Sequence, residues 1–395
     1  MKLNILLITA SYKPAYIYGG PTMSVSQLAE NLVEFGGHAV SVYTTTANGK
    51  SELDIEANIC HLVNGVNVTY FDRITKDHSH FSPKLYIALW RNIHRFDIIH
   101  LQAWWHLVSV LSAVICIFKN KTFILSPRGT LSNYSFNNKT TFLKKIFHNL
   151  VGKPILLRAK FLLTSEKEQD DLISLLKKPV PCFVLPNFVK TSPDKTDRQM
   201  PSSASFELLF LSRIEEKKGL EFLLAALHNC QIPYKLTIAG SGQKHYVDSL
   251  KRLAQSLKIQ QNIQWIGHVK DEFKFEVLNQ HHLLILPSYD ENFANVVVES
   301  LSVGTAVLIT PNVGLADFIV KHNLGWLCAQ KSEDIKSKIE YIFTQTQQLK
   351  IIRSIAPNLI DTIFKAENLT SKYISYYSTT LGNDKDHKIN VSDNF

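Results

Sequence analysis

One stretch of the sequence decides the fold: LNILLITASYKPAYIYGGPTMSVSQLAENLVEFGGHAVSVYTTT, residues 3–46. Its first part, Leu3–Thr9, is a mostly apolar run, which is typical of a strand buried on both faces of a sheet. A loop with two glycines follows, and apolar residues then recur at helical spacing from Val25 to Leu32. Ala39–Thr45 predicts a second strand. Strand, loop, helix and strand form a βαβ unit, so we expect a parallel sheet.

The same alternation continues to residue 190. Leu107–Phe118 predicts a helix. Further strands are predicted at Asp97–Leu101, Thr122–Ser126, Phe161–Thr164 and Cys182–Leu185. The next segment, Lys190–Ser205, reads KTSPDKTDRQMPSSAS, and its polar character and two prolines indicate a linker between domains.

The pattern restarts after the linker. Strands are predicted at Phe206–Leu211, Lys235–Ala239, Ile263–Ile266, Leu283–Leu286 and Ala306–Ile309. Helical patterns separate them at Leu220–Leu227, Tyr246–Leu257 and Val296–Leu301. Ser332 to about Thr380 is predicted to be helical, and residues 383–395 form a polar tail.

These patterns predict an α/β protein with two doubly wound parallel sheets. We expect a first domain at residues 1–190, a linker at 191–205 and a second domain at 206–365. Two Rossmann-like halves facing a cleft would place ligands at the carboxyl ends of their strands. Residues at those ends are therefore the candidates for function.

The net charge of the 395-residue chain is +9, and its source is local. Between Asp97 and Glu166 there is no acidic residue, and the rest of the chain is neutral. The stretch contains nine basic residues: Lys119, Lys121, Arg128, Lys139, Lys144, Lys145, Lys153, Arg158 and Lys160. A nucleic-acid-binding protein usually spreads positive charge over a binding face, so nucleic acid is not the expected partner.

The cysteines and the apolar runs indicate the redox compartment of the protein and its relation to membranes. The five cysteines are scattered without a CxxC pair or zinc-type spacing, which fits a reducing compartment and no metal site. The N-terminus is interpreted as a buried strand, since no small-residue cleavage site follows it. The longest apolar run, Leu107–Phe118, is too short to span a bilayer. We therefore expect a cytoplasmic protein that contacts a membrane at most with its surface.

The loop SRIEEKKG, residues 212–219, carries Arg213 and Lys218 after the first strand of the second half. Arginine supplies a planar fork of donors and lysine a point charge, and together they can neutralise a diphosphate. The alternative is a charged loop in solvent. Gly240, in the segment AGSG that follows the next strand, allows a close backbone approach to a ligand or a plain tight turn.

Glu291 and Glu299 belong to the segment LPSYDENFANVVVE, residues 286–299. We expect a helix to start near Asn292, with free N–H groups that favour an anion. The two carboxylates would then lie about 12 Å apart along the axis, which suits the two ends of an extended ligand. A plain first-turn acid is the alternative for Glu291. The neighbours of Glu299 are apolar, so its carboxylate needs a partner.

Together these residues resemble the family 4 glycosyltransferases of the GT-B fold, among them bacterial enzymes that build capsule, exopolysaccharide or O-antigen. The matching motifs follow one another along nearly the whole chain: YGGPT at 18–22, Pro186-Asn187, Arg213 to Lys218, Gly267-His268-Val269, Glu291 with Glu299, and KAENL at 365–369. The resemblance implies an acceptor-binding first domain and a nucleotide-sugar-binding second domain. It also implies that a helix at about 366–380 crosses back onto the first domain.

The resemblance gives each residue a role. Arg213 and Lys218 would hold the leaving diphosphate, and Glu299 would bind the ribose hydroxyls of the donor. Glu291 and the backbone of Asn292, Phe293 and Ala294 would contact the transferred sugar. The donor site would be completed by a set of loop residues: Gly19, Gly20, Gly240, His268 and Val269.

The resemblance also implies retention of anomeric configuration with no metal and no other cofactor. The sequence agrees in one respect, because the acidic DxD at 384–386 lies in the polar tail and not after a strand. Catalysis would then rest on charge stabilisation of the leaving phosphate, which also accepts the proton of the acceptor hydroxyl. No protein general base is implied.

Several positions depart from the family pattern. Ala294 and Ser212 replace glycines, and Ala306 replaces a proline. The added Cβ of Ala294 would alter the choice of donor. Where many members have a His-Gly pair, this chain has Pro127-Arg128-Gly129, and Arg128 is a candidate for binding an anionic group of acceptor or donor.

The acid-free stretch predicts an amphipathic basic helix, in which Phe142, Ile146 and Leu150 alternate with lysines. One interpretation is that residues 139–160 dock on an anionic membrane that carries a lipid-linked acceptor. The alternative is an ordinary surface helix. His100 and Trp104 follow a strand and are candidates to line the acceptor site, although a role in the core or at its rim explains them equally well.

The sequence therefore predicts a retaining glycosyltransferase, a hexosyltransferase of surface polysaccharide biosynthesis. Its partners would be a nucleotide-sugar donor and a saccharide or lipid-linked acceptor, at the inner face of the cytoplasmic membrane. A nucleotide-sugar epimerase of the same fold is one alternative, because it binds the same donor. A membrane-associated scaffold with a decayed site is another, suggested by Ala294 and Ser212. A dinucleotide dehydrogenase is disfavoured, because the first loop lacks GxGxxG.

Overall fold

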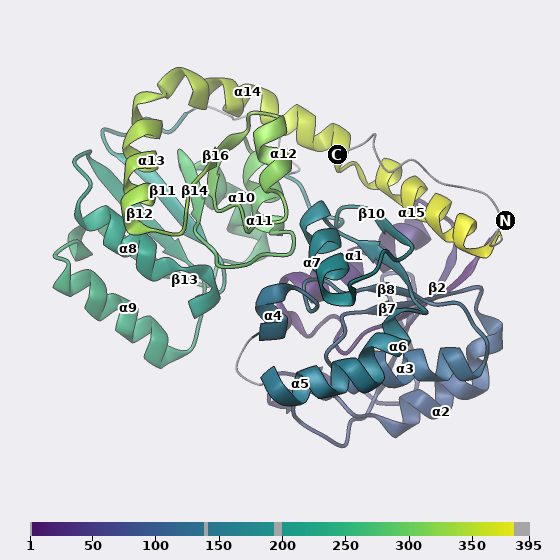
Figure 1. Ribbon diagram of the computed structural model, residues 1–395. Helices are drawn as coiled ribbons and strands as arrows, with labels where there is room; N and C mark the ends of the chain where they lie inside the picture. The colour runs from purple at the N-terminus through teal and green to yellow at the C-terminus, as the bar shows by residue number, and fades with distance from the viewer. Residues whose placement is uncertain (1, 138–140, 193–199, 383–395) are drawn as a thin grey trace. The chain divides into compact units, whose positions relative to one another are not determined.

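The computed structural model describes residues 2–137, 141–192 and 200–382. The chain divides into two compact units (Figure 1). Unit 1 comprises Met1–Phe188 and Phe364–Phe395, and unit 2 comprises Val189–Ile363. The first boundary lies two residues before the expected end of the first domain. Residues 193–199 of the expected linker and the polar tail at 383–395 fall outside the described residues.

Unit 1 is built on an eight-stranded sheet with the order β10-β9-β8-β7-β1-β2-β6-β5. All neighbouring strands are parallel except β5 and β6, which form an antiparallel hairpin. The strands are β1 (Asn4–Ile8), β2 (Ala39–Thr45), β5 (Cys60–Val63), β6 (Val66–Phe71), β7 (Ile98–Gln102), β8 (Ile124–Ser126), β9 (Lys160–Leu163) and β10 (Cys182–Val184). The βαβ unit predicted from residues 3–46 is confirmed, with α1 at Gly20–Glu34.

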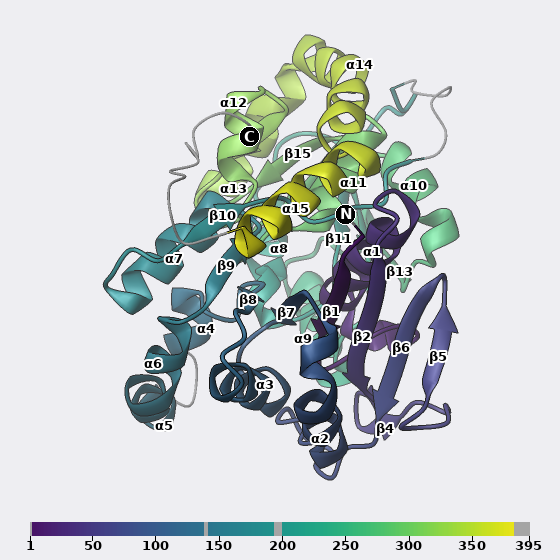
Figure 2. The ribbon, with the colours of Figure 1, turned by 90° about the vertical axis from the view of Figure 1, so that its right-hand side faces the viewer.

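Helices cover both faces of this sheet (Figure 2). One face packs against α1 and against α15 (Ala366–Leu381), the last described helix. The other face packs against helices from the middle of unit 1: α2 (Pro83–Asn92), α3 (Leu107–Phe118), α6 (Lys153–Leu156) and α7 (Glu166–Leu176). Apolar residues from the two faces of each central strand therefore enter two separate cores.

Two buried tyrosines fasten α15 to unit 1. Tyr373 donates a hydrogen bond to the carbonyl oxygen of Pro186 at 3.1 Å. The hydroxyl of Tyr377 lies 2.9 Å from Nδ1 of His100, a residue of β7. Both tyrosine side chains have almost no exposed surface. The last described helix is thus an integral part of unit 1, although the whole of unit 2 separates it from Phe188 in sequence.

Unit 2 contains a six-stranded parallel sheet with the order β13-β12-β11-β14-β15-β16. Its strands are β11 (Phe206–Leu211), β12 (Tyr234–Ala239), β13 (Ile263–Gly267), β14 (Leu283–Leu286), β15 (Ala306–Ile309) and β16 (Gly325–Leu327). The helices are α8 (Leu220–His228), α9 (Lys244–Ser256), α10 (Asp271–Asn279), α11 (Asn295–Ser302), α12 (Ala316–Lys321), α13 (Ser332–Thr344) and α14 (Thr346–Ile363). The prediction of two doubly wound parallel sheets is confirmed.

The expected strands and helices are confirmed where their apolar pattern is continuous, as in β14 and β15, whose residues are all buried. Three strands of the two large sheets were not predicted from the sequence. β5 and β16 lie at sheet edges and are half-exposed. An edge strand buries one side only, so its composition carries less signal. β6 lies between β2 and β5 and is mostly buried, so its omission has no such explanation. Within the described ranges, no helix combines the length and the apolarity needed to cross a bilayer.

Candidate active site

The candidate donor residues of unit 2 come from loops at the carboxyl ends of β11, β12, β13 and β14. Lys218 closes a turn of 3₁₀ helix, Glu216–Lys218, that follows β11. Its ammonium is ion-paired with Glu291, which comes from the loop after β14. Ser288 donates a hydrogen bond to the same carboxylate oxygen at 3.3 Å. The structure therefore joins two of the three predicted catalytic residues directly.

A second ion pair binds the same two loops together. Lys217 lies 2.9 Å from Asp290, and the backbone N–H of Tyr289 donates to the carbonyl of Lys217 at 2.9 Å. The sequence prediction missed this contact. Its signal was present in two complementary doublets, Lys217-Lys218 in one loop and Asp290-Glu291 in the other.

The third predicted catalytic residue, Arg213, lies in the same loop as Lys218 but points into solvent. Its side chain is 56% exposed, and its guanidinium contacts Glu215 at 3.1 Å. An exposed pair of this kind is weak, and its guanidinium is available to a ligand. Lys218 is thus held by a half-buried ion pair, whereas the Arg213 side chain remains accessible to solvent.

Gly219 and Gly240 let these loops pack closely. Gly219 has a φ of +66°, and a Cβ there would lie 2.3 Å from the carbonyl oxygen of Pro287. A Cβ on Gly240 would lie 1.8 Å from the carbonyl oxygen of Ser212. The Gly240 loop therefore supports the loop that carries Arg213, and of the two roles expected for it, the close turn is the one that the contacts explain.

The glutamate segment differs from the expectation in one respect. α11 begins at Asn295, so Glu291 precedes the helix instead of lying on its first turn. Glu291 is fixed by its backbone, which exchanges hydrogen bonds of 3.0 Å and 2.9 Å with Asn312 and Gly314. The expected helix start near Asn292 is therefore wrong, the distance estimate loses its geometric basis, and Glu291 is not a first-turn acid.

Residues 292–294 form the bend between Glu291 and the helix. Phe293 is buried, with 2% of its surface exposed. Ala294 adopts a φ of +68°, in the left-handed region that favours glycine. The departure from the family glycine thus occurs at a position where the backbone itself prefers glycine.

Glu299 has the partner that its apolar surroundings require. It lies on α11 and is almost fully buried, and the Lys274 ammonium of α10 lies 2.8 Å from its carboxylate. Burial raises the pKa of the Glu299 carboxyl, and the charge of Lys274 opposes that rise. Sequence reasoning did not single out Lys274.

The His268-Val269 turn follows β13, as expected. His268 is exposed, and the preceding Gly267 accepts a hydrogen bond of 2.7 Å from the N–H of Gly240. The loops after β12 and β13 are therefore neighbours at the same edge of the sheet as Lys218 and Glu291. Among the residues that the structure describes, no three His, Cys, Asp or Glu side chains are grouped so that they could hold a metal ion.

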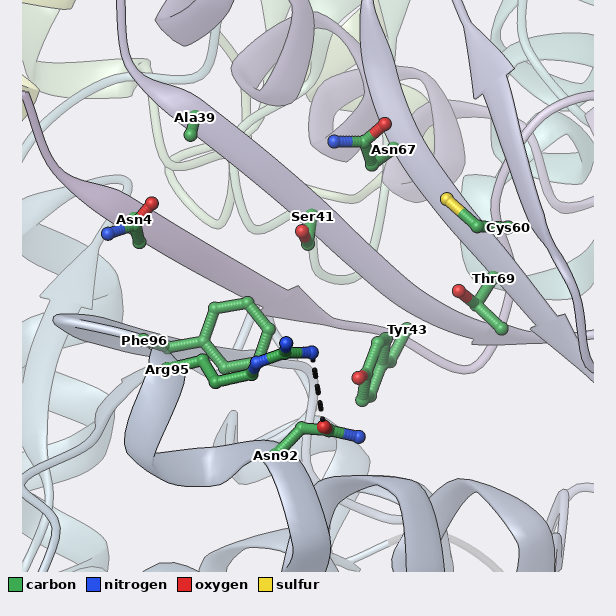
Figure 3. Close-up of a pocket in the computed structure, with 10 residues that line it drawn as sticks. All are labelled: Asn4, Ala39, Ser41, Tyr43, Cys60, Asn67, Thr69, Asn92, Arg95 and Phe96. Atoms are coloured by element: carbon green, nitrogen blue, oxygen red, sulfur yellow. Dashed lines mark hydrogen bonds between the residues drawn. The ribbon is translucent and has the colours of Figure 1, made fainter.

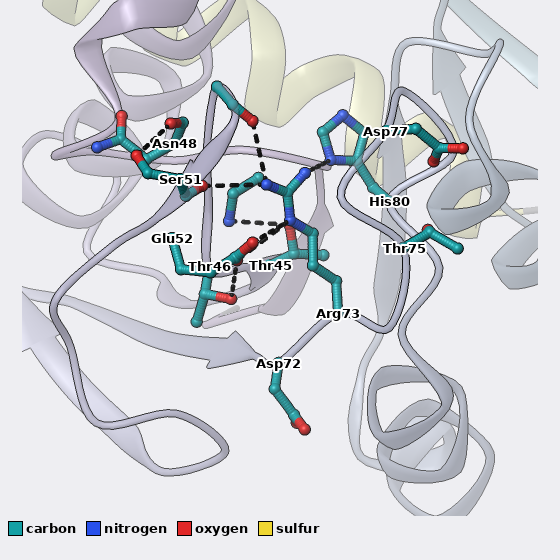
Figure 4. Close-up of polar contacts among 12 residues, drawn as sticks. Thr45, Thr46, Asn48, Ser51, Glu52, Asp72, Arg73, Thr75, Asp77 and His80 are labelled. Atoms are coloured by element: carbon teal, nitrogen blue, oxygen red, sulfur yellow. Dashed lines mark hydrogen bonds and ion pairs between the residues drawn. The ribbon is translucent and has the colours of Figure 1, made fainter.

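In unit 1, the glycine loop begins α1. Gly19 caps the helix with a φ of 64°, and the Tyr18 hydroxyl accepts a hydrogen bond from the N–H of Gly49 at 2.9 Å. Gly49 lies in the turn between two short antiparallel strands, β3 (Ala47–Asn48) and β4 (Ser51–Glu52). Buried Arg73 holds this hairpin by donating to the carbonyl of Gly49 at 3.1 Å and to Glu52 at 2.9 Å (Figure 4). Because Tyr18 directly precedes Gly19, this arrangement holds in place the chain that leads into Gly19 and Gly20.

His80 completes the cluster around Arg73. Its Nδ1 lies 3.0 Å from the guanidinium (Figure 4). Burial, with a further contribution from the charge of Arg73, lowers the pKa of His80 to about 4. His80 is therefore neutral at physiological pH and accepts a hydrogen bond from Arg73.

Two of the predicted acceptor-side residues lie in the interior of unit 1. His100 has no exposed surface, and its ring nitrogens contact the hydroxyls of Tyr377 at 2.9 Å and Ser126 at 2.8 Å. Burial lowers the pKa of His100, which keeps the ring neutral. Trp104 is also fully buried. Of the two roles left open for these residues, the core role is correct, because no surface remains for an acceptor.

Arg128, the third candidate, lies at the carboxyl end of β8 and remains partly exposed.

A separate hollow of about 390 Å³ lies on the sheet of unit 1 (Figure 3). It is lined by Asn4, Ala39, Ser41, Tyr43, Cys60, Asn67, Thr69, Asn92, Arg95 and Phe96. None of the predicted site residues belongs to it.

The basic segment forms α5 (Thr141–Phe147), a π-helical turn at His148–Gly152, and α6. Phe147 packs inward against the Trp105 ring. Five apolar side chains are at least 38% exposed, and we call them the apolar ridge: Phe142, Ile146, Leu150, Val151 and Leu157. Lys145 and Arg158 are exposed beside them. Lys139 lies outside the described residues.

Comparison with known proteins adds independent findings. A family model described as Glycosyltransferase Family 4 matches residues 18–193, and one described as Glycosyl transferases group 1 matches residues 194–358. An uncharacterized glycosyltransferase of Methanocaldococcus jannaschii is 23% identical over 96% of this chain and 99% of its own length.

Solved structures share the architecture. Sucrose-phosphate synthase of Thermosynechococcus elongatus superposes with a TM-score of 0.74 at 18% identity, covering 96% of this chain and 100% of that one. Anabaena Alr3699/HepE, in complex with UDP and glucose, superposes with a TM-score of 0.73 at 19% identity, covering 95% and 100%. Identities this low establish the shared fold and leave substrates open.

Proposed function

Since the chain belongs to the family 4 glycosyltransferases and has the GT-B fold, we propose that it transfers a sugar from a nucleotide-diphosphate sugar to a glycan or lipid-linked saccharide. The transfer would retain the anomeric configuration, would need no metal ion and would serve surface polysaccharide biosynthesis. The observation that carries the proposal is the pairing of Lys218 with Glu291 at the strand ends of unit 2. The cation and the carboxylate that meet there are the residues to which the resemblance assigns the diphosphate and the transferred sugar.

Binding of the donor would break the ion pair between Lys218 and Glu291 and give each side chain a new partner. When a diphosphate enters, Lys218 exchanges the Glu291 carboxylate for phosphate oxygens, and exposed Arg213 adds a second cation. Glu291 is then free to accept hydrogen bonds from hydroxyls of the transferred sugar. Glu299 binds the ribose hydroxyls, and Lys274 keeps its buried carboxylate ionised.

In the chemical step, the bond between the anomeric carbon and the phosphate oxygen breaks. The bond from the acceptor oxygen to that carbon forms on the same face, and the proton of the acceptor hydroxyl passes to the departing phosphate. Negative charge develops on the diphosphate, so Lys218 and Arg213 stabilise the transition state more than the ground state. This is the part of catalysis that the chain itself supplies.

The nucleobase is proposed to be uracil. The solved HepE structure contains UDP and glucose, and it covers 95% of this chain. A thermal-shift panel of UDP-, GDP-, ADP- and dTDP-sugars together with NAD tests the donor class, with stabilisation by a UDP-sugar expected. Stabilisation by NAD alone would contradict the proposal. Product analysis without acceptor identifies an epimerase, which would convert the donor by itself.

The apolar ridge supports a position at the inner face of the cytoplasmic membrane. Phe142, Ile146 and Leu150 recur every four residues and are 75%, 40% and 73% exposed. Lys145 and Arg158 beside them provide attraction to anionic lipid headgroups. Apolar side chains enter the headgroup boundary while the cations stay in the polar layer, and a lipid-linked acceptor would be met there.

Vesicle co-sedimentation tests this docking. Leu150→Ser should release the protein from vesicles with anionic lipid, whereas Leu62→Ser should not. Leu62 is the matched control, because its side chain is 74% exposed on β5 and lies outside the ridge. Equal binding of both variants and the wild type, or no binding of the wild type to anionic vesicles, would remove the membrane from the proposal.

A further inference from the structure

Four neighbouring strand ends of unit 1 converge on Arg128. Gln102 is the last residue of β7, Arg128 follows β8, Glu168 lies in the first turn of α7 after β9, and Asn187 follows β10. These strands are adjacent and parallel in the order β10-β9-β8-β7. Their carboxyl ends form one edge, where α/β sheets bind ligands.

The guanidinium of Arg128 is held by neutral groups. Its Nε donates to Oε1 of Gln102 at 2.7 Å, and its Nη1 donates to Oδ1 of Asn187 at 2.5 Å. In the part of the chain that the structure describes, Nη2 makes no hydrogen bond, and no carboxylate forms a salt bridge with Arg128. Burial lowers the pKa of this guanidinium, so its surroundings oppose the charge that it carries.

Glu168 is the acidic residue whose charge reaches Arg128, but its oxygens are already occupied. Oε1 accepts the N–H of Gly129 at 2.7 Å. Oε2 accepts the N–H and the hydroxyl of Thr164 at 2.8 Å and 3.0 Å. Glu168 therefore fixes the loop beside Arg128 and gives the guanidinium no direct partner.

Gln102 contributes an unused donor next to the guanidinium. Arginine can only donate, so the Gln102 amide must present its oxygen to Arg128, and its orientation is fixed. Its Nε2 is buried and, among the described residues, has no hydrogen-bond partner. Oε1 and Nε2 share one amide carbon, so this donor belongs to the same amide group that contacts the guanidinium.

The backbone conformation is unusual at Arg128 and directly after Gln102. Arg128 has a φ of 51°, and Ala103, which follows Gln102, has a φ of 61°. Non-glycine residues in this region are strained, and such strain persists where the surrounding structure imposes it, often at ligand sites. The two strained positions flank the two unused donors.

We propose that Arg128 and Gln102 form an anion subsite in unit 1, which takes a carboxylate or phosphate group of the acceptor saccharide. The inference rests on the proposed glycosyl transfer and names the class of its acceptor. An anionic group compensates the charge of the guanidinium and accepts hydrogen bonds from Nη2 and Nε2 together. A neutral sugar hydroxyl satisfies one donor at most and leaves the charge uncompensated.

Direct titration of the nucleotide-free full-length protein tests the subsite. The probes are D-glucuronate, inorganic phosphate and D-glucose as the neutral analogue of glucuronate. At least one anion should bind about tenfold more tightly than glucose, and Arg128→Gln should remove that difference. Preference for glucuronate identifies an acidic sugar, and preference for phosphate identifies a phosphate-bearing or lipid-phosphate acceptor.

Two further variants keep the result decisive. Arg158→Gln makes the same charge change on the exposed basic segment and should leave the anion preference intact. Gln102→Glu places a carboxylate beside Arg128, so it should raise the melting temperature and abolish anion binding in a folded protein. Absence of any anion preference in the wild type overturns the inference, as does an unchanged preference in both Arg128→Gln and Gln102→Glu.

The outcome is independent of the proposed donor chemistry, because no nucleotide takes part in the titration. UDP binding is measured separately in the wild type and in Arg128→Gln. Intact UDP binding without anion binding rejects the subsite alone. Anion binding without any nucleotide binding rejects the proposed transfer and leaves the subsite in place.

Discussion

The cations of the candidate sites in the two units have different kinds of partner. In unit 2, three cations of the candidate site and its surroundings are paired with carboxylates: Lys218 with Glu291, Lys217 with Asp290, and Lys274 with Glu299. In unit 1, Arg128 has only amide partners. The ion pairs of unit 2 are neutral until a ligand displaces a carboxylate. In the described part of unit 1, a bound anion would be the first ionic partner of Arg128.

The difference bears on specificity as well as on binding. A diphosphate that enters unit 2 must compete with Glu291 for Lys218, so only a ligand with enough charge opens the pair. An anion entering unit 1 displaces no carboxylate, and its affinity depends on charge compensation alone. The following four predictions test whether the pairs of unit 2 serve ligand binding and whether the buried polar residues of unit 1 serve its structure.

The largest effect is expected from Lys218→Ala. The variant removes a cation that faces the leaving diphosphate and leaves Glu291 without its partner, so kcat/KM should fall about 10²- to 10³-fold. Steady-state kinetics and UDP titration measure it. Lys244→Ala is the control, since Lys244 is 89% exposed and, within the described ranges, its ion pair is with Asp248 one helical turn away. Unchanged kinetics in Lys218→Ala would remove the residue from the site.

The second prediction concerns Lys274→Met, which leaves the Glu299 carboxylate buried and unpaired. Breaking such a pair should lower the free energy of unfolding by about 3 kcal/mol at neutral pH. Burial raises the pKa of Glu299 above its ordinary 4.5, so the folded variant retains the proton longer than the unfolded chain. Stability should therefore fall as pH rises through 4.5 towards the folded pKa.

Melting temperatures across this pH range measure the effect. Lys270→Met is the matched control, because Lys270 directly precedes α10, is 76% exposed and lies 3.9 Å from Glu272. The control should show little change at any pH. A pH profile of Lys274→Met that parallels the control would mean that Glu299 finds another partner.

A smaller effect is expected from Tyr377→Phe in unit 1. The change removes the hydroxyl that contacts buried His100 and should cost about 1 kcal/mol of stability. Chemical denaturation measures it, and Tyr341→Phe at a 52% exposed tyrosine is the control. The kinetic constants should stay at wild-type values. A loss of kcat at unchanged stability would show that His100 acts in the reaction after all.

The smallest effect is expected from Ala294→Gly. Glycine relieves the strain of a φ of +68° but costs conformational entropy in the unfolded chain, so the net gain should stay below about 1 kcal/mol. The informative readout is the KM for the donor, which should change because residue 294 follows the Glu291 loop. Ala103→Gly, at a φ of 61° in unit 1, should leave that KM unchanged. A donor KM that responds equally to both variants would argue against a local role for Ala294.

The alternation of strands and helices was predictable because it is written in local periodicity. A strand such as Leu283–Leu286 is a short apolar run bounded by polar residues, and no distant contact is needed to identify it. Arg213, Lys218 and Glu291 were chosen as candidates because they follow predicted strands, and Glu299 because its neighbours are apolar. The start of α11 was placed three residues too early, because nothing local showed that Glu291 pairs with the segment around Val313.

The contacts that define the candidate sites join residues far apart in the chain. Lys218 and Glu291 are separated by 73 positions, and His100 and Tyr377 by 277. A local pattern reveals that a polar residue follows a strand, but it does not reveal whether a distant helix covers that residue. For this reason His100 and Trp104 were equally compatible with an acceptor site and with the core, and only the packing of unit 1 decided.

The sequence by itself determined two parallel sheets, the family and the residue types at the strand ends, because hydrophobic periodicity and motif order are properties of the chain. The tertiary structure alone decided which charges are neutralised and which remain without an ionic partner. Compensation of a buried charge depends on the position of every neighbouring group in space. That is why Lys218 and Arg128, both basic residues after a strand, differ so much in their surroundings.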